Sequence, residues 1–563
     1  MSAQDEAEGQ AEEAVAPAKK KTSNIKKYPM KEISGKVVDA ATGEPLPGVK
    51  IKSYNNSFYA AMTDEAGQYT ISVPTFVTSL SADLEGYNFS QVAINDRKEG
   101  VDIKLYSDSY LTNYKTKTGA TKTVDTKGFE NSTAITVDQE IGNRMGADVR
   151  TISRSGIPGV GTSMFIEGYH SINSVSQPLI VIDGVVSDMM YSSGMLHNGY
   201  YNNLLSTLSM DDIADVKVMK NGTAIYGAQA ANGVILITTK RNTSMATRID
   251  VNISGGVEFM PKTADMMNAD DYRSYASGLL KSTGSKLEDF KFLKTDPSYY
   301  YYNMYHNNTD WKDVVYDEAM TQNYSIHIQG GDEVANYNLS VGYMDAQSTL
   351  KKNDMSRFNI RFNSDIVLTD KLTTRFDVSY SNLKRDLRDD GLASSFEPSA
   401  ISSPNVLALV KSPFTAPYDF ATDGTMSNFI ADADDYLTEV LGATVSVANP
   451  LGILYYGEEK NKNRTDNTAV NLAITPKWQF SRNMSLQELF SYTSQTFDEI
   501  YYTPVTGMPV HKAGDAGNVE NSYGSNFSKH NAVQSDTRFD WAIPLGAHRL
   551  EPVIAADLPC SLE

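Results

Sequence analysis

The chain has 563 residues, a length typical of three or four domains. Its 50 lysines and arginines against 69 aspartates and glutamates give a net charge of −19, which argues against a nucleic-acid binder. The single cysteine, Cys560, excludes a disulfide framework, and the absence of any run of about 18 apolar residues excludes a transmembrane helix. A transmembrane β-barrel fits this composition, because apolar and polar residues alternate along its strands.

Residues 1–31 are predicted to form a disordered linker. They hold a run of acidic residues, then six lysines, with no apolar periodicity between them. Lys19 to Lys21 are followed by Thr22, Ser23 and Asn24 rather than by an apolar segment, so no signal peptide is predicted there.

Residues 32–106 contain short β-branched runs separated by turn residues, which predicts a small β-sandwich. Asp64 and Glu65 are interpreted as part of the turn Asp-Glu-Ala-Gly67 rather than as a catalytic acid pair. The order of Gly35-x-Val-x-Asp, Gly43-Glu-Pro-Leu-Pro-Gly-Val and Thr63-Asp-Glu-x-Gly-x-Tyr resembles the carboxypeptidase-regulatory-like β-sandwich. The resemblance implies a domain with no catalysis of its own.

Residues 107–127 are rich in Ser, Thr and Lys and predict a second linker. Residues 128–242 then carry four motifs in a fixed order, beginning at Met164, Pro178, Met210 and Ala224. Together these motifs resemble the plug domain of the SusC/RagA family of TonB-dependent outer-membrane transporters. The positions that carry the resemblance are Glu167, Gly168, Pro178, Asp183, Gly184, Asp212, Lys220, Tyr226, Gly227, Asn232, Gly233, Thr238 and Lys240.

Two apolar runs in this region, Leu179 to Ile182 and Val234 to Ile237, predict strands buried on both faces. Turn dipeptides bound them, Asp183-Gly184 after the first run and Asn232-Gly233 before the second. Asp183 is interpreted as a turn cap, so its replacement by Asn is expected to be mild. Gly227 and Gly233 are expected in tight connections that a Cβ would strain.

Glu167 departs from the family pattern, which usually has arginine before this glycine. The resemblance implies that an arginine there would anchor the plug to the barrel wall by a charge-assisted contact. Because Glu167 carries the opposite charge, that contact is not expected at this position.

From residue 243 to residue 563 the pattern has period two, as in Tyr337, Leu339 and Val341, which alternate with Asn338 and Ser340. One face suits lipid and the other suits water, so this region is predicted to be part of a transmembrane antiparallel β-barrel. Nine strands are expected, near 248–260, 319–330, 334–347, 355–367, 372–386, 463–478, 481–500, 528–542 and 546–556.

Nine strands are too few for a plugged transporter barrel, which has about 22. The chain ends on Glu563 shortly after Pro559, a residue expected to break a strand. A truncated chain is therefore expected, whose wall strands alone would not close into a barrel.

No chemical motif in the sequence predicts an enzyme. The seven histidines, which include His170 and His197, show no spacing that places two on one helical face, so no metal site is predicted. The segment Gly156 to Gly161 lacks the Lys-Ser/Thr of a phosphate-binding loop, and no nucleophile elbow is present. No cofactor is expected. The aromatic run of Tyr299 to Tyr302, Tyr305 and Trp311 is interpreted as interface or local packing rather than as a sugar-stacking platform.

The resemblance implies active import of oligosaccharides or peptides through the outer membrane of a Gram-negative bacterium. The implied partners are TonB, which would supply energy from the inner membrane, a SusD-like surface lipoprotein, and outer-membrane lipid. The usual TonB box would lie between sandwich and plug, where Tyr110 to Tyr114 matches it poorly. The alternatives are a TonB-linked surface receptor with a signalling role, or a non-functional truncated fragment.

Overall fold

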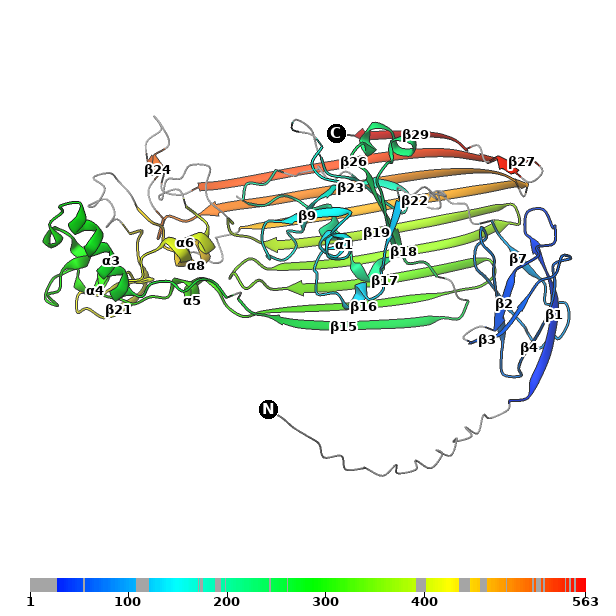
Figure 1. The fold of residues 1–563 in the computed structure, drawn as a ribbon, viewed down its shortest axis with the longest axis horizontal. Helices are drawn as coiled ribbons and strands as arrows, with labels where there is room; N and C mark the ends of the chain where they lie inside the picture. Colours follow the sequence, from blue (N-terminus) through cyan, green and yellow to red (C-terminus); the bar gives the residue numbers. More distant parts are fainter. Residues whose placement is uncertain are drawn as a thin grey trace, which may run out of the picture.

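The computed structural model divides the protein into three units (Figure 1). An N-terminal sandwich lies beyond one end of a long antiparallel sheet, here called the wall, and a central domain lies against the wall. The structure describes residues 28–53, 56–107, 121–170, 172, 176–187, 194–197, 199–242, 245–260, 262–390, 401–434, 446–455, 463–481, 483–508, 511–512, 518–519, 522–541, 543–545, 548–550 and 553–562. Most of the expected first linker and the expected TonB-box interval lie outside the described residues.

The sandwich consists of two sheets, in the orders β4-β1-β7 and β3-β2-β5-β6, packed around one apolar core. Its strands are β1 (Met30–Asp39), β2 (Lys50–Ser53), β3 (Asn56–Met62), β4 (Gln68–Pro74), β5 (Ser79–Asp83), β6 (Ser90–Ala93) and β7 (Ile103–Leu105). Asp64 caps a turn, because its Oδ1 accepts hydrogen bonds from the backbone N–H groups of Ala66 and Gln68. Gly67 supplies a positive φ of 72° in that turn. The expected sandwich and the turn are confirmed.

The central domain is built on a five-stranded mixed sheet in the order β12-β11-β14-β13-β8. Strands β11 and β14 are the two predicted apolar runs, and they pair in parallel at the middle of the sheet. β8 falls inside the expected second linker, so the sheet begins earlier than the sequence indicated. The elements are β8 (Thr121–Val124), η2 (Phe129–Asn131), α1 (Val137–Met145), β9 (Val149–Ser153), β10 (Thr162–Ile166), β11 (Leu179–Ile182), β12 (Val185–Ser187), η3 (Leu204–Thr207), η4 (Met210–Asp212), β13 (Ile213–Met219), α2 (Thr223–Tyr226), η5 (Gly227–Ala230) and β14 (Val234–Thr239).

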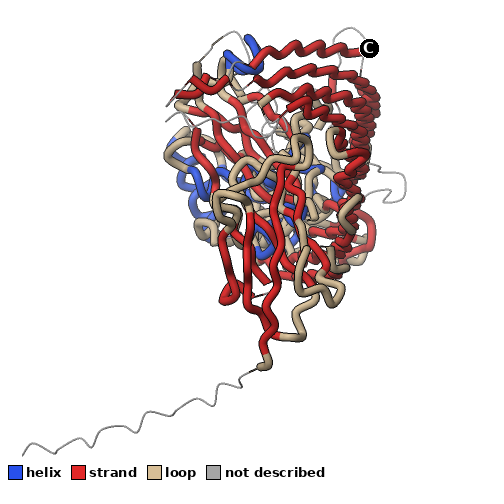
Figure 2. Tube along the Cα trace, turned by 90° about the vertical axis from the view of Figure 1, so that its right-hand side faces the viewer, coloured by secondary structure: helices blue, strands red, loops and turns tan. Residues whose placement is uncertain are grey.

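The wall has nine antiparallel strands in sequence order, and within the described chain its first and last strands are open edges. The strands are β15 (Arg248–Glu258), β16 (Ala319–Gly331), β17 (Ala335–Ala346), β18 (Met355–Thr369), β19 (Leu372–Asp386), β22 (Arg464–Ser481), β23 (Met484–Thr503), β26 (Ser522–Trp541) and β29 (Val553–Leu562). The first eight overlap the predicted segments closely. Figure 2 shows the wall curving along one side of the molecule.

The ninth strand differs from the prediction. The segment expected at 546–556 contains part of a small hairpin, β27 (Ile543–Leu545) and β28 (His548–Leu550), and the wall strand β29 starts only at Val553. Pro559 does not break β29, where it pairs with Gln534 of β26. Proline is tolerated there because β29 is an edge strand, and an edge strand can spare a backbone donor on its open side.

The two faces of the wall differ in polarity as the alternation predicted. Large apolar side chains stand exposed on the outer face, among them Val251, Ile253, Ile326, Tyr343, Phe358, Phe376, Leu472, Ile474 and Phe490. Polar and charged side chains on the inner face are buried, among them Asn338, Ser340, Arg357, Asn359, Arg361, Asn363, Ser381, Gln487 and Gln495. This is the reverse of a water-soluble sandwich and the pattern of a wall that meets lipid outside.

Short helices gather at the end of the wall opposite the sandwich (Figure 1). The elements there and in neighbouring loops are α3 (Ala269–Ser282), η6 (Leu287–Asp289), η7 (Lys291–Leu293), α4 (Tyr302–Tyr305), α5 (Trp311–Val315), α6 (Pro404–Val410), β20 (Tyr418–Phe420), β21 (Met426–Ile430), α8 (Pro450–Tyr455), β24 (His511–Lys512) and β25 (Asn518–Val519). In the aromatic run, Tyr305 and Trp311 are buried in local cores, whereas Tyr300 is exposed. Among the described residues, every helix is too short or too polar to cross a bilayer.

Candidate functional site: the contact between central domain and wall

The central domain fills the concave inner face of the wall, and its hydrogen bonds reach every wall strand from β15 to β26. The wall side chains in these bonds are Asn252, Asn323, Ser340, Arg357, Ser381, Asn467, Glu499 and Gln534, in strand order. Between the described residues of the domain and the wall, two neighbouring cavities hold about 30 Å³ each, room for one or two water molecules. The central domain therefore occupies much of the space that the described wall strands partly enclose.

The thirteen motif residues separate to the two ends of the central sheet. Pro178, Asn232 and Gly233 lie where β11 and β14 begin, and Glu167, Gly168, Lys220, Tyr226 and Gly227 lie in connections at the same end. Asp183, Gly184, Asp212, Thr238 and Lys240 lie at the opposite end of the sheet, and Asp183 and Asp212 there contact the wall. The sequence resemblance does not distinguish these two groups.

The first charged contact joins Asp183 and Asp212 to Arg361 of β18. The Arg361 guanidinium lies 3.5 Å from the Asp183 carboxylate and 3.6 Å from that of Asp212, and all three side chains are nearly buried. Asp183 also accepts hydrogen bonds from the backbone N–H of Thr239 at 2.9 Å and from its hydroxyl at 2.7 Å. Asp212 accepts from the Ser340 hydroxyl at 2.5 Å. Asp183 thus caps the turn as expected, and it is also an ion-pair partner of the wall.

A second charged contact lies just beyond β14. Arg241 donates to Asp365 of β18 at 2.9 Å and to Asp377 of β19, and Arg375 lies 3.2 Å from Asp365. Burial opposes the charge on Arg241, but the carboxylates of Asp377 and Asp365 outweigh it and raise the pKa of this guanidinium above its ordinary value. The segment that leaves the central domain is therefore tied to two wall strands.

Two further wall arginines hold the backbone of the central domain. Arg357 donates to the carbonyl oxygen of Ser206, and Arg385 donates to that of Gly159, each at 3.0 Å. Both arginine side chains are almost completely buried. These bonds fix η3 and the loop around Gly159 through their backbone carbonyl oxygens.

The loop around Gly159 is also fixed from within the central domain by Asp138 of α1. This buried carboxylate accepts hydrogen bonds from the backbone N–H of Thr162 and from the side-chain amide of Asn203. Burial raises the pKa of Asp138, and these hydrogen bonds act in the opposite direction. The loop that meets Arg385 is therefore held on both sides.

Glu167 does not take part in the contact with the wall. It is exposed, with a positive φ of 57°, and pairs with Lys220 of the same domain at 2.9 Å. Hydrogen bonds to Glu167 and Asp148 raise the pKa of Lys220. The charged contacts run in both directions: Arg361 of the wall meets carboxylates of the central domain, and Arg241 after β14 meets carboxylates of the wall.

A third charged contact lies at the end of the wall nearer the helices. Glu499 of β23 meets Leu196 and His197 of the central domain, and both the Glu499 and His197 side chains are completely buried. The sequence analysis found no metal-ligand spacing among the histidines and assigned no role to this one. Glu499 stands at an inward position of an alternating strand, a signal that could have marked it as buried.

The sandwich docks at the other end of the wall. Lys104 pairs with Asp370 at 2.8 Å, the Lys477 ammonium donates to the carbonyl oxygen of Ser107 at 2.6 Å, and the N–H of Met245 donates to Gln91 at 2.8 Å. A cavity of about 390 Å³ lies between the sandwich, the segment after β14 and the wall turns.

Comparison with known proteins identifies both N-terminal units. Residues 33–114 match the family described as the CarboxypepD_reg-like domain, and residues 114–234 match the TonB-dependent Receptor Plug Domain. The chain is 30% identical over 370 residues to the TonB-dependent receptor SusC of Bacteroides thetaiotaomicron, covering 63% of this chain and 34% of that protein. It is 24% identical over 535 residues to the TonB-dependent receptor P3 of Formosa agariphila, covering 92% of this chain and 47% of that protein. These relatives are receptors, not enzymes.

Among solved structures, the RagAB peptide importer in its closed-closed state has a TM-score of 0.57 at 17% identity, covering 78% of this chain and 47% of that chain. This likeness concerns the fold. The chain spans a third to a half of the length of the curated relatives that it matches.

Proposed function

We propose that this chain, a SusC/RagA-type TonB-dependent transporter by its domains and fold, imports oligosaccharide or peptide nutrients across the outer membrane of a Gram-negative bacterium. The observation that carries the proposal is the central domain seated on the polar inner face of a wall whose outer face is apolar. Such an arrangement separates two aqueous spaces until the central domain moves.

The contacts between central domain and wall suit a gate that is closed at rest. They combine hydrogen bonds and ion pairs with small apolar clusters, in which Ile135, Val160 and Val185 of the central domain pack against residues of the wall and its loops. The polar contacts can be exchanged for contacts with water as a passage opens, whereas separating the apolar clusters exposes surface that water does not stabilise and so favours the closed state.

Energy for opening would come from outside this chain. The sequence holds no phosphate-binding loop, and the match to the TonB-dependent plug supports TonB as the partner that pulls on the central domain. The segment before β8 is the natural point of attachment, because β8 is an edge strand of the central sheet. Force applied there would act on the five-stranded sheet directly.

The helices beyond the far end of the wall support a SusD-like lipoprotein as the second partner. Leu409 and Val410 of α6 and Tyr300 in the turn before α4 are exposed there, and Phe429 of β21 is 78% exposed. Apolar side chains exposed at an end that faces away from the sandwich suit a partner that delivers solute from outside the cell.

The test is nutrient uptake by cells that carry or lack the gene. Labelled oligosaccharide and peptide pools are offered, with and without a protonophore that collapses the inner-membrane gradient. We expect uptake of one pool to require both the gene and the gradient. Unchanged uptake after deletion, together with an altered transcriptional response to the same pool, would favour the receptor alternative.

A further inference from the structure

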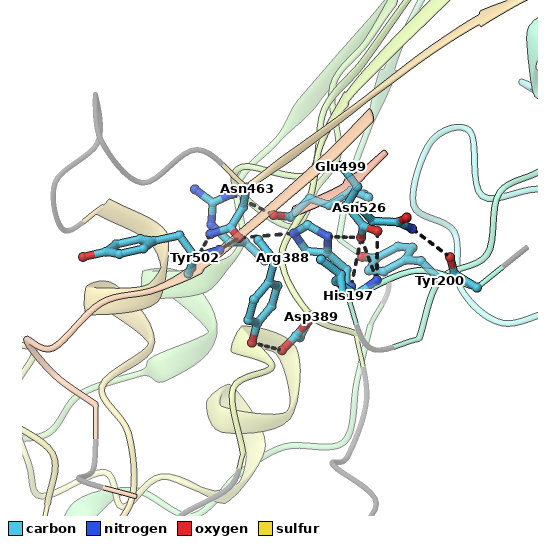
Figure 3. A network of polar contacts seen from close by, with 12 residues as sticks. His197, Tyr200, Arg388, Asp389, Asn463, Glu499, Tyr502 and Asn526 are labelled. Atoms are coloured by element: carbon cyan, nitrogen blue, oxygen red, sulfur yellow. Dashed lines mark hydrogen bonds and ion pairs between the residues drawn. The ribbon is translucent and has the colours of Figure 1, made fainter. Parts of the chain in front are cut away.

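The contact between His197 and Glu499 has a hydrogen-bond pattern that determines how many protons the pair holds (Figure 3). Glu499 Oε1 accepts from the backbone N–H of His197 at 3.0 Å and lies 2.7 Å from His197 Nδ1. The backbone N–H of Leu196 donates to both Glu499 oxygens at 2.9 Å. One proton must lie between Nδ1 and the carboxylate, because two lone pairs at 2.7 Å would repel.

The other ring nitrogen faces an oxygen whose orientation is determined independently. His197 Nε2 lies 3.2 Å from Asn463 Oδ1. The Asn463 amide pairs twice with the backbone of Tyr502: its Oδ1 accepts from the N–H and its Nδ2 donates to the carbonyl oxygen, each at 2.7 Å. Reversing this amide would place donor against donor and acceptor against acceptor. Asn463 therefore presents an acceptor to Nε2, and Nε2 must carry a proton.

The His197–Glu499 pair thus holds two protons in the docked structure, wherever the shared proton resides. Removing one proton would leave a lone pair on one ring nitrogen facing the oxygen of Glu499 or of Asn463. Neither oxygen can donate a hydrogen bond in exchange, so the docked arrangement does not satisfy that nitrogen.

Charged and titratable groups lie around the pair on β23, on β19 and the segment that follows it, and in the central domain. Tyr501 of β23 packs edge-on against the His197 ring at 5.1 Å, and its hydroxyl donates to Asp389. Arg385 of β19 interacts electrostatically with Glu499, and Arg388 follows β19 beside the network (Figure 3). From the central domain, Arg154 lies 3.9 Å from Asp390, and the Tyr200 hydroxyl donates to Asn353. A tyrosine hydroxyl, a carboxylate and a guanidinium ordinarily keep their charge between about pH 6 and about pH 8, whereas an imidazole does not.

We propose that His197 is a positioning residue that ties the outer loop of the central domain, here residues 194–197, to the wall only when its ring carries both protons. This contact therefore weakens as the pH rises. The proposal rests on the proposed import function and adds a regulation of the same contact. The docked loop binds about one proton more than the free loop near neutral pH, so docking is favoured on the acid side and lost on the alkaline side. A cell that acidifies its surroundings would hold the loop closed.

The experiment measures backbone hydrogen exchange in the full-length protein in detergent, from about pH 6 to about pH 9. The protection factors, corrected for the intrinsic pH dependence of exchange, are followed for the amides of Leu196 and His197, which both donate to Glu499. We expect protection to fall by about tenfold per pH unit above about pH 6.5, where a free imidazole loses its second proton, for as long as the docked loop retains that proton. Amides in β11 and β14 should show no such fall.

His197→Gln is the test variant, and His170→Gln is its matched control. A glutamine side chain does not titrate, so the pH dependence at Leu196 should disappear in the His197 variant. His170 lies in the same domain but is exposed and bonded only to the carbonyl oxygen of Ile166, so its replacement should leave the dependence intact. Glu499→Gln should abolish the dependence as well.

The proposal would be overturned if the protection factors of the Leu196 and His197 amides in the wild-type protein did not change with pH. It would also be overturned if the His197→Gln variant showed the same pH dependence at Leu196 as the wild-type protein. Exchange reports on the loop whether or not solute is carried. A pH-dependent loop in a protein that imports nothing would thus refute the proposed function alone, and import with a pH-independent loop would refute this inference alone.

Discussion

The sandwich and the central domain are both small β-rich units, but they are stabilised in different ways. The sandwich buries sixteen apolar residues in one core of its own and meets the rest of the protein through a few surface contacts. The central domain has an apolar core of similar size, yet it also places Asp183, Asp212 and Arg241 in nearly buried contacts with the wall. The sandwich satisfies its buried groups by itself, whereas the central domain needs the wall to pair its nearly buried charges. The proposed import function requires the second kind of stability, because the central domain would have to move relative to the wall.

The largest contrast is expected when each unit is produced alone. Residues 28–107 should give a cooperative thermal transition, because their core and turns are complete. Residues 121–242 should not, because their ion-pair partners Arg361, Asp365 and Asp377 would be absent. Differential scanning calorimetry measures the thermal unfolding of both fragments. A stable, cooperative central domain would show that the wall contacts contribute little to its fold.

Gly233→Val should destabilise the central domain by about 4 kcal/mol. The residue has a φ of 87°, and an added Cβ would lie 2.7 Å from Ile166 Cδ1 and 3.0 Å from the carbonyl oxygen of Met219. Gly227→Val is the matched control, because Gly227 has a similar φ of 66° but open space around it. Limited proteolysis of the central domain should separate the two variants. Equal resistance in both would show that the clash is relieved elsewhere.

Arg361→Met should cost about 3 kcal/mol, because it leaves two nearly buried carboxylates without their shared cation. Arg361→Lys keeps the charge and should recover part of the loss. Denaturant-induced exposure of the central domain, followed by a fluorophore on that domain, measures both variants. Stability equal to wild type in Arg361→Met would show that Ser340 and Thr239 suffice to solvate the two carboxylates.

Asp183→Asn should cost about 1 to 2 kcal/mol, which is more than the mild effect that a turn cap alone predicts. In asparagine, an NH2 group replaces one of the two carboxylate oxygens. That group can neither accept the hydrogen bond from Thr239 nor attract the Arg361 guanidinium. The same unfolding assay applies, with Asp64→Asn as a control turn cap in the sandwich. If both substitutions lower the free energy of unfolding by the same amount, the contact between Asp183 and Arg361 makes no net contribution to stability.

Lys104→Ala should change stability by less than about 0.5 kcal/mol, because its pair with Asp370 is half exposed on both sides. The thermal transition of the sandwich should remain where it is in the wild-type protein. A large shift would show that the sandwich depends on the wall, and the distinction between the two units would fail.

Much of the architecture follows from local sequence patterns. Alternation along β15 to β26 predicts eight wall strands and their lipid-facing residues, since a period of two admits only one assignment of faces. Apolar runs and Asx-Gly dipeptides likewise predict β11, β14 and their turns, because a positive φ such as that of Gly233 excludes most other residues. Pro559 misled the prediction, since proline's effect depends on whether a strand is at an edge, and the sequence does not state strand order.

The contacts that hold the central domain in place were decided only by the tertiary structure. Alternation shows that Arg361 points inward, but not that it meets Asp183, which lies 178 residues away along the chain. His197 and Glu499 are separated by 302 residues, and neither lies in a motif. The partners in ion pairs of this kind depend on how the folded central domain packs against the folded wall. Local sequence determines the surfaces, and only docking in three dimensions determines which charges become partners.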